Sequence, residues 1–268
     1  MSSELHNFKV RHIGIINWLG LWTLFTKEVM RFIKVGFQTL LAPVISSLMF
    51  LVIFKYAFGD ARPAIHGVEY VQFLIPGLMM MGMLNQSFAN TASSLIISKV
   101  QGNSVDFLMP PLSALELCLA FIGGAATRGL MVGIGTGLAM MLMMPFDIAH
   151  PWAVLVFGLN AVLMMGMIGL IAGITGNRFD HLAAIQNFFL LPLTMLSGTF
   201  YSITVLPESF QRLSMINPFF YLIDGFRYGF TGVSDGNVGT GVLFVSVINI
   251  ILASTCYLIL RSGWRLKT

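Results

Sequence analysis

The chain has 268 residues, of which 56% are apolar and only 10% are charged, and its mean hydropathy is +0.84. Soluble domains usually carry about 25% charged residues, so this composition excludes a disordered chain and weighs against a soluble enzyme. The net charge of +4 comes from 15 Lys and Arg against 11 Asp and Glu, which is too sparse for a surface that binds nucleic-acid phosphates. We therefore expect a polytopic membrane protein and no nucleic-acid partner.

The first element in chain order is an amphipathic helix predicted over residues 18–37. Lys27, Arg31 and Lys34 recur at helical spacing on one face, and aromatic and aliphatic side chains cover much of the rest. We expect this helix to lie along the membrane surface, with membrane lipid as its partner. Glu28 lies three residues before Arg31, so the two side chains can form a weak pair. Two interpretations stay open: a plain anchor, or a surface that also contacts a cytoplasmic protein.

Six continuous apolar stretches are long enough to cross the hydrocarbon layer, which takes about 20 helical residues. They predict an all-α integral membrane fold that forms one domain over residues 1–268. The segment before the first span, the second and fourth connections and the tail hold ten Lys and Arg, against three in the other connections. This excess predicts that both termini are cytoplasmic. The predicted spans are 38–58, 71–97, 114–144, 151–175, 182–203 and 240–260.

Polar residues occur at membrane depth in the second and third spans. Gln86 and Asn90 lie on one side of the second span, and Arg128 lies inside the third. A buried Arg is costly in a membrane and must reach water, a carbonyl oxygen or an acid. Each of these residues therefore either forms hydrogen bonds between helices or lines a wet translocation path.

The third span also carries three glycines at intervals of four residues, namely Gly129, Gly133 and Gly137. Small residues at this spacing let two helix backbones approach closely. We expect tight helix packing here, either within a subunit or across a dimer.

The second connection, residues 98–113, is predicted to form a short cytoplasmic helix. The helix covers Val105 to Met109, Asn103 or Ser104 can cap its start, and two prolines end it. The S-x-x-E sequence that follows, residues 113–116, has the form of a capping box that opens the third span.

Asp106, Phe107 and Leu108 give this short helix its chemistry. We expect the apolar side chains to be exposed beside the acid, so that they form a knob for a groove on another protein. The alternative is an ordinary turn that packs on the bilayer surface.

The connection before the last span, residues 204–232, is too apolar for a solvated loop and too broken for a span. It predicts two short helices, separated at Asn217-Pro218, that enter the outer leaflet and return. Non-helical backbone at such depth needs protein or a wet cavity around it, which favours an outer gate. Asp224 and Arg227, three residues apart, form either a structural pair or a gating pair.

Signatures of catalysis are missing from the chain. There is no G-x-x-x-x-G-K-[ST] sequence, no G-x-S-x-G sequence and no metal-ligand spacing among the five His. We expect no enzyme activity and no cofactor or metal on this chain, so active transport would need energy from elsewhere.

Two stretches resemble the carboxy-terminal signature of ABC-2-type permeases. The first is residues 191–201, LPLTMLSGTFY, which is similar to the family's P-x-x-x-x-S-G-x-F/Y sequence. The order of an amphipathic helix, six spans and broken outer helices also resembles the family. The second stretch comprises Leu206-Pro207, Asn217-Pro218, Tyr221, Asp224-Gly225 and Arg227-Tyr228.

The resemblance implies the membrane subunit of an ATP-binding-cassette exporter in the bacterial inner membrane. Two copies would pair, each with a separate ATPase subunit that holds ATP and Mg. An amphipathic, lipid-linked or saccharide-type substrate would pass between the two copies. The alternative from the residues is an ion-coupled secondary carrier or channel, which should show acids at membrane depth or inverted repeats.

The resemblance also implies roles for individual residues. The loop from Gln101 to Pro111 would be the coupling helix, in which Asp106 stands where many members have Glu. The residues expected at the ATPase are Gln101, Asp106, Phe107, Leu108, Lys27, Glu28 and Arg31. The residues expected along the path or gate are Arg128, Gln86, Asn90, Tyr221, Asp224 and Arg227.

Overall fold

A computed structural model describes residues 14, 16–58, 64–103 and 105–264. This part of the chain is helical, and its only β-type pairing is an isolated bridge between Ile65 and Val68. The long helices are α1 (Trp18–Ile33), α2 (Ala42–Phe58), α3 (Tyr70–Val100), α5 (Ala114–Met143), α6 (Pro151–Thr175) and α11 (Val238–Ser262). The short elements are η1 (Phe37–Leu41), α4 (Val105–Leu108), α7 (Phe179–Ile185), η2 (Gln186–Leu190), α8 (Leu191–Leu196), η3 (Ile203–Val205), α9 (Glu208–Ile216) and α10 (Pro218–Thr231).

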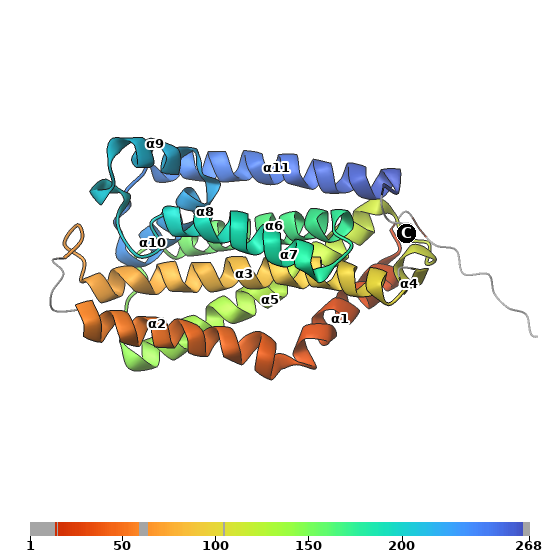
Figure 1. Cartoon of the computed structure of the whole chain (residues 1–268), viewed down its shortest axis with the longest axis horizontal. Helices are drawn as coiled ribbons and strands as arrows, with labels where there is room; N and C mark the ends of the chain where they lie inside the picture. Colours follow the sequence, from red (N-terminus) through yellow and green to blue (C-terminus); the bar gives the residue numbers. More distant parts are fainter. Residues whose placement is uncertain (1–13, 15, 59–63, 104, 265–268) are drawn as a thin grey trace, which may run out of the picture.

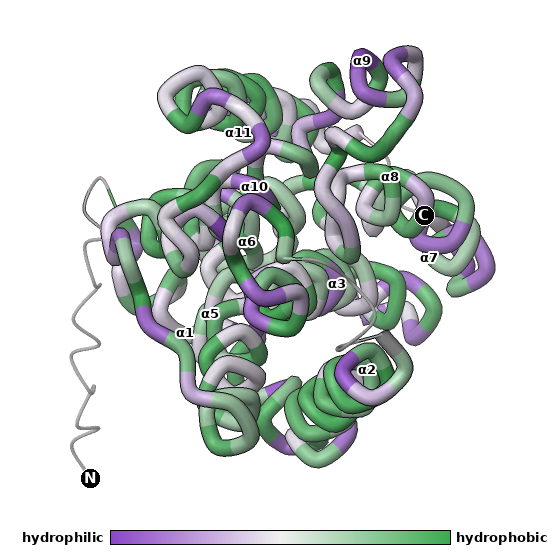
Figure 2. Tube along the Cα trace, turned by 90° about the vertical axis from the view of Figure 1, so that its left-hand side faces the viewer, coloured by the Kyte–Doolittle hydropathy of each residue, from purple (hydrophilic) through white to green (hydrophobic). Residues whose placement is uncertain are grey.

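The long helices α2, α3, α5, α6 and α11 run along the length of the molecule (Figure 1). The short helix α4 lies at one end of this bundle, which we call the α4 end, and α9 and α10 lie at the opposite α9 end. Helix α3 packs against both α5 and α6, so it occupies the centre. Figure 2 shows α2 and α11 on opposite sides of the bundle, with α3 and α6 between them.

Four of the described helical segments are long and apolar enough to cross a membrane. In α2 and α11 only 11% of the apolar window is buried, against 61% in α5 and 56% in α6. Because the peripheral helices expose apolar side chains, they suit contact with lipid. The four segments are Phe37–Ala57, Ala114–Met143, Pro151–Thr175 and Val238–Ser262.

The other two predicted spans have different forms. Helix α3 covers the predicted span 71–97, and it carries Asn85, Gln86 and Asn90 among its apolar side chains. The predicted bounds 182–203 are wrong, because the helical segment runs continuously through α7, η2 and α8 from residue 179 to residue 196. The chain then turns at Gly198, whose φ of +74° is readily adopted only by glycine.

The predicted helix 18–37 also ends earlier than expected, at Ile33. After a short turn the chain enters η1, a π-helical segment that continues directly into α2. The amphipathic helix and the first apolar segment are therefore separate elements joined by an irregular connection.

The three spaced glycines of α5 pack inside the subunit. A Cβ on Gly133 would lie 2.6 Å from Met83 Sδ, and a Cβ on Gly137 would lie 2.7 Å from Met79 Cε. A Cβ on Gly129 would meet Ser87, which lies on α3 as Met83 and Met79 do. The glycines therefore set the close contact between α5 and α3, which decides between the two packing alternatives.

Candidate functional site

A polar cluster joins α1 to the centre of the bundle. Glu28 is only 1% exposed and accepts a hydrogen bond from Ser94 Oγ on α3 at 2.7 Å. Arg31 Nη2 lies 3.3 Å from Glu28 Oε2, which confirms the predicted pair. The same Nη2 donates to the backbone oxygen of Asn90 at 2.7 Å and to its Oδ1 at 3.0 Å, and Nη1 donates to Ser93 Oγ at 3.2 Å.

The approach of α1 depends on a glycine in α5. A Cβ on Gly124 would lie 2.7 Å from Glu28 Cβ, so a larger residue would push α1 away. Leu24 and Phe32, one helical turn on either side of Glu28, are buried along the same stripe. Helix α1 therefore presents its acid to protein, while Trp18 and Trp22 remain exposed.

A second polar contact lies nearby, between α5 and α3. Arg128 is 8% exposed, and its Nη2 donates to Gln86 Oε1. Its Nε is buried without a hydrogen-bond partner, and none of the carboxylates that the structure describes lies within ion-pair distance. Arg31 is close enough to repel it. Two cations and one acid therefore share this region, which leaves an excess positive charge.

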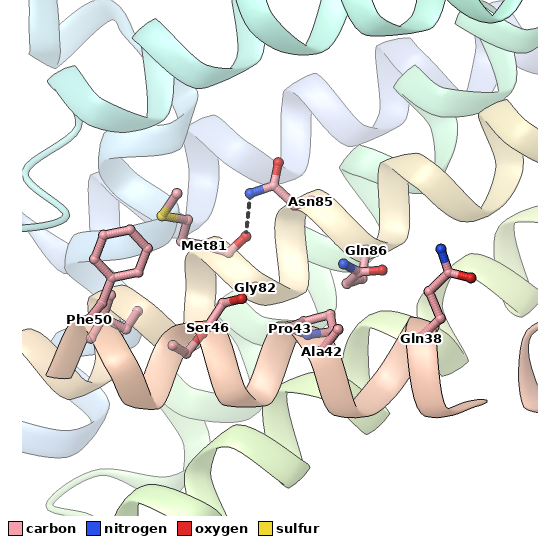
Figure 3. Close-up of a pocket in the computed structure, with 11 residues that line it drawn as sticks. Gln38, Ala42, Pro43, Ser46, Phe50, Met81, Gly82, Asn85 and Gln86 are labelled. Carbon is pink, nitrogen blue, oxygen red and sulfur yellow. Dashed lines mark hydrogen bonds between the residues drawn. The ribbon is translucent and has the colours of Figure 1, made fainter. Parts of the chain in front are cut away.

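Gln86 also lines a groove of about 340 Å³ between α2 and α3. Figure 3 shows Gln38 and Gln86 toward one end of the groove, and Phe50 and Met81 toward the other. Asn85 lies between them and donates to the backbone oxygen of Met81 at 3.0 Å. The groove thus has a polar end and an apolar end.

The groove is connected to the broken helical segment of α7, η2 and α8. Gln186 Nε2 on η2 donates to Asn85 Oδ1 at 3.4 Å. Asn85 therefore contacts both its own helix and a neighbouring element, which joins the groove to the broken helical segment.

The short helix α4 forms as predicted, but its exposed surface differs from the prediction. Phe107 is only 4% exposed, and its ring packs edge to face on Phe121 of α5, with 5.6 Å between ring centroids. Leu108 is half-buried, whereas Asp106 is exposed. Met109 is 79% exposed and supplies the apolar surface that the prediction gave to Phe107. The prediction of an exposed Phe107 is wrong because the ring anchors α4 to α5.

The segment around α4 is attached to the start of α1. The predicted capping box is present: Glu116 N donates to Ser113 Oγ at 3.3 Å, and Ser113 N donates to Glu116 Oε2 at 2.6 Å. The other carboxylate oxygen of Glu116 accepts the backbone N–H of Asn17, and Asn17 Nδ2 donates to Pro111 O at 3.3 Å. One buried acid therefore holds the starts of α1 and α5 together.

At the α9 end, Asp224 and Arg227 form hydrogen bonds with different partners. Asp224 accepts the backbone N–H groups of Asp235 at 2.9 Å and Gly236 at 3.0 Å. Arg227 donates to Gly198 O at 2.5 Å, and its guanidinium lies 3.7 Å from the centroid of the Phe73 ring. Both side chains are buried, so these contacts favour a structural role for the two residues.

Tyr221 packs between aromatic rings where α10 meets α11. Its ring centroid lies 5.1 Å from that of Phe220 and 5.1 Å from that of Phe244. The side chain therefore belongs to a helix contact and does not line the groove between α2 and α3.

Comparison with known proteins agrees with this architecture. Residues 20–231 match the family model described as ABC-2 type transporter. This chain belongs to the ABC-2 type transporter family. Inner membrane transport permease YadH from Escherichia coli K12 is 37% identical over 255 residues, covering 94% of this chain and 98% of the relative. More distant relatives named Nodulation protein J include that of Rhizobium leguminosarum bv. viciae, 22% identical over 91% of this chain and 95% of the relative.

As a member of the ABC-2 family, the chain is a multi-pass membrane protein and a transporter subunit, not a member of a catalytic family. The fold divides the residues predicted at the ATPase in two. Gln101, Asp106 and Lys27 are exposed, whereas Glu28 and Phe107 are buried in the bundle. Arg31 and Leu108 are half-buried.

Sequence reasoning missed Asp235 and the capping role of Asn217, which both shape the α9 end of this ABC-2 chain. Asp235 accepts hydrogen bonds from Ser202 Oγ at 2.7 Å, Ile203 N at 3.0 Å and the His66 ring at 2.9 Å. Asn217 caps α10 and donates to Leu193 O at 2.8 Å. No local pattern predicts the contacts of Asp235 because its partners lie far away in sequence, but the Asn-Pro pair was a signal for the cap.

Proposed function

We propose that this chain is the permease subunit of an ATP-binding-cassette exporter in the bacterial inner membrane. In this proposal two copies pair, and each works with a separate ATPase subunit that holds ATP and Mg. An amphipathic, lipid-linked or saccharide-type substrate passes between the two copies. The observation that carries the proposal is that α4 and the start of α1 are both attached to α5 at the same end of the bundle, α4 through Phe107 and α1 through Glu116.

This attachment supports one docking surface for a cytoplasmic partner. Asp106 and Met109 are exposed on and just after α4, and Lys27 is exposed on α1. Because α4 is fixed by Phe107 and α1 by Glu28, a force on this surface would reach the bundle through packed side chains. The ATPase is expected to push on these elements as it binds and hydrolyses ATP.

The six-span arrangement is part of the proposal. Four segments meet the length and hydropathy of a span, α3 adds a fifth, and α7, η2 and α8 together form a sixth. Helix α1 lies on the membrane surface, with the exposed Trp18 and Trp22 in the headgroup zone. Both termini are then cytoplasmic, and α9 and α10 lie at the outer side, where they close the exit.

The proposal predicts a stable complex with an ATP-binding-cassette ATPase. The test is to express this chain with the ATPase encoded by a neighbouring reading frame that contains a Walker A sequence. The membranes are extracted into lipid nanodiscs, and native mass spectrometry counts the subunits. We expect two permease and two ATPase subunits. Purification of the chain without bound ATPase, under conditions in which the nanodiscs hold folded protein, would contradict the proposal.

A further inference from the structure

The groove between α2 and α3 is lined by three polar side chains whose hydrogen-bonding groups are not all used by the described contacts. Among the described contacts, the side-chain amide of Gln38 and the hydroxyl of Ser46 make no hydrogen bond. Gln86 uses its Oε1 to accept from Arg128, which leaves its amide nitrogen free for a ligand. The polar end of the groove therefore offers hydrogen-bond donors.

Behind these donors lies a cation without a matching acid. Arg128 binds Gln86 and lies close to Arg31, and Glu28 is the one acid among the described residues that pairs with either of them. A buried positive charge is unfavourable unless an anion or several dipoles compensate it. Because the guanidinium of Arg128 binds the Gln86 oxygen, it polarises the amide and makes its N–H groups better donors.

The opposite end of the groove has different chemistry. Phe50, Leu78 and Met81 line it, and the adjoining α2 exposes most of its apolar side chains. A molecule that fills the groove would thus place an anionic, oxygen-rich head near Gln38 and Gln86, and a hydrocarbon portion along Phe50 and Met81 (Figure 3).

We propose that this groove binds a phosphate-bearing amphiphile, whose phosphate accepts hydrogen bonds from Gln86 and Gln38 and compensates the charge of Arg128. This inference rests on the proposed permease function, and it narrows the substrate class to anionic amphiphiles. Phosphate fits because it offers several acceptor oxygens to several donors and carries the missing negative charge.

The first test compares two probes that differ only in the phosphate. The purified chain, in a neutral maltoside detergent, is titrated with phosphatidic acid or with diacylglycerol of the same acyl chains, and native mass spectrometry measures binding. We expect phosphatidic acid to bind about tenfold more tightly, as befits hydrogen bonds to a charged group. Equal affinities would overturn the proposal.

Inorganic phosphate distinguishes an amphiphile site from a simple anion site. If the hydrocarbon portion contributes, millimolar inorganic phosphate will fail to displace phosphatidic acid, which supports the proposal. Complete displacement would overturn the assignment of an amphiphile, because the head group alone would then account for binding.

Two substitutions locate the site. Arg128→Met removes the cation and is expected to lower the affinity for phosphatidic acid by about tenfold. Gln86→Glu supplies the missing acid beside Arg128, so it is expected to raise the thermal unfolding temperature and to abolish the preference for phosphatidic acid. Because Gln86→Glu compensates the buried charge of Arg128, it tests the proposed phosphate site even if Arg128→Met fails to fold.

Asn177→Asp is the matched control, because it adds the same charge at an exposed position outside the groove. Asn177→Asp should leave the affinity for phosphatidic acid unchanged.

Wild-type affinity for phosphatidic acid in Gln86→Glu would overturn the proposal. Each preparation is also tested for binding of the ATPase, which separates the two hypotheses. If Gln86→Glu loses the preference for phosphatidic acid but still binds the ATPase, both hypotheses are supported. If it keeps that preference and binds the ATPase, only the groove site is refuted. If the wild-type chain does not bind the ATPase, the permease function is refuted.

Discussion

Replacing Glu28 by Gln is expected to destabilise the folded chain by about 3 kcal/mol or more, the range typical of breaking a buried ion pair. Glu28 is 1% exposed, pairs with Arg31 and accepts from Ser94. The neutral amide would leave Arg31 and Arg128 without an acid to pair with among the described residues. The measurement is thermal or denaturant unfolding of the purified chain in detergent, followed by helical circular dichroism.

Two further variants test whether charge is the cause. Lys27→Gln removes a charge from the next residue of α1, but that side chain is exposed, so unfolding should change by less than about 0.5 kcal/mol. Combining Glu28→Gln with Arg31→Met restores the charge balance and should recover part of the loss. If Glu28→Gln unfolds like the wild type, Glu28 does not anchor α1 as the contacts indicate.

Replacing Asp106 and Phe107 together by Ala is expected to reduce ATP-dependent transport by at least about tenfold. Asp106 is exposed, so its loss removes a side chain from the proposed docking surface for the ATPase. Phe107 is buried on Phe121, and truncating a buried Phe costs about 3–5 kcal/mol, more than a four-residue helix can sustain. Helix α4 would then detach from α5, and ATP hydrolysis would proceed without moving the bundle.

The measurement compares ATP hydrolysis and transport by the same reconstituted complex. Hydrolysis should persist while transport falls, since the ATPase keeps its own catalytic residues. Glu208→Ala is the control, because it removes an exposed acid from α9 at the opposite end and should leave coupling intact. Wild-type transport in the Asp106/Phe107 variant would show that α4 does not transmit the motion.

Features fixed by neighbouring residues could be predicted from the sequence. The capping box of Ser113 and Glu116, the break at Asn217-Pro218 and the short helix at Val105 each depend on a few adjacent residues, and the structure contains all three. Apolar length likewise predicted four of the spans well. These features are local, so the fold does not override them.

Features that depend on tertiary contacts were harder to predict. Phe107 looked exposed because its partner Phe121 lies in the next helix, and Asp235 was missed because its partners lie in other connections. The burial of Glu28 did have a signal, since Leu24 and Phe32 lie four residues before and after it on one helical stripe. Arg128 was singled out, but only the structure shows that Gln86 is its partner.

Proteoliposomes test the dependence on a separate ATPase most directly. They are prepared with this chain alone, with the ATPase alone, or with both, and loaded with fluorescent phosphatidic acid, a labelled glycolipid or an amphipathic dye. ATP-dependent movement of at least one probe is predicted only when both proteins are present, and it should vanish when the Walker A Lys of the ATPase is replaced. Uphill movement of a probe by this chain alone, driven by an ion gradient, would contradict the proposed function and indicate a secondary carrier.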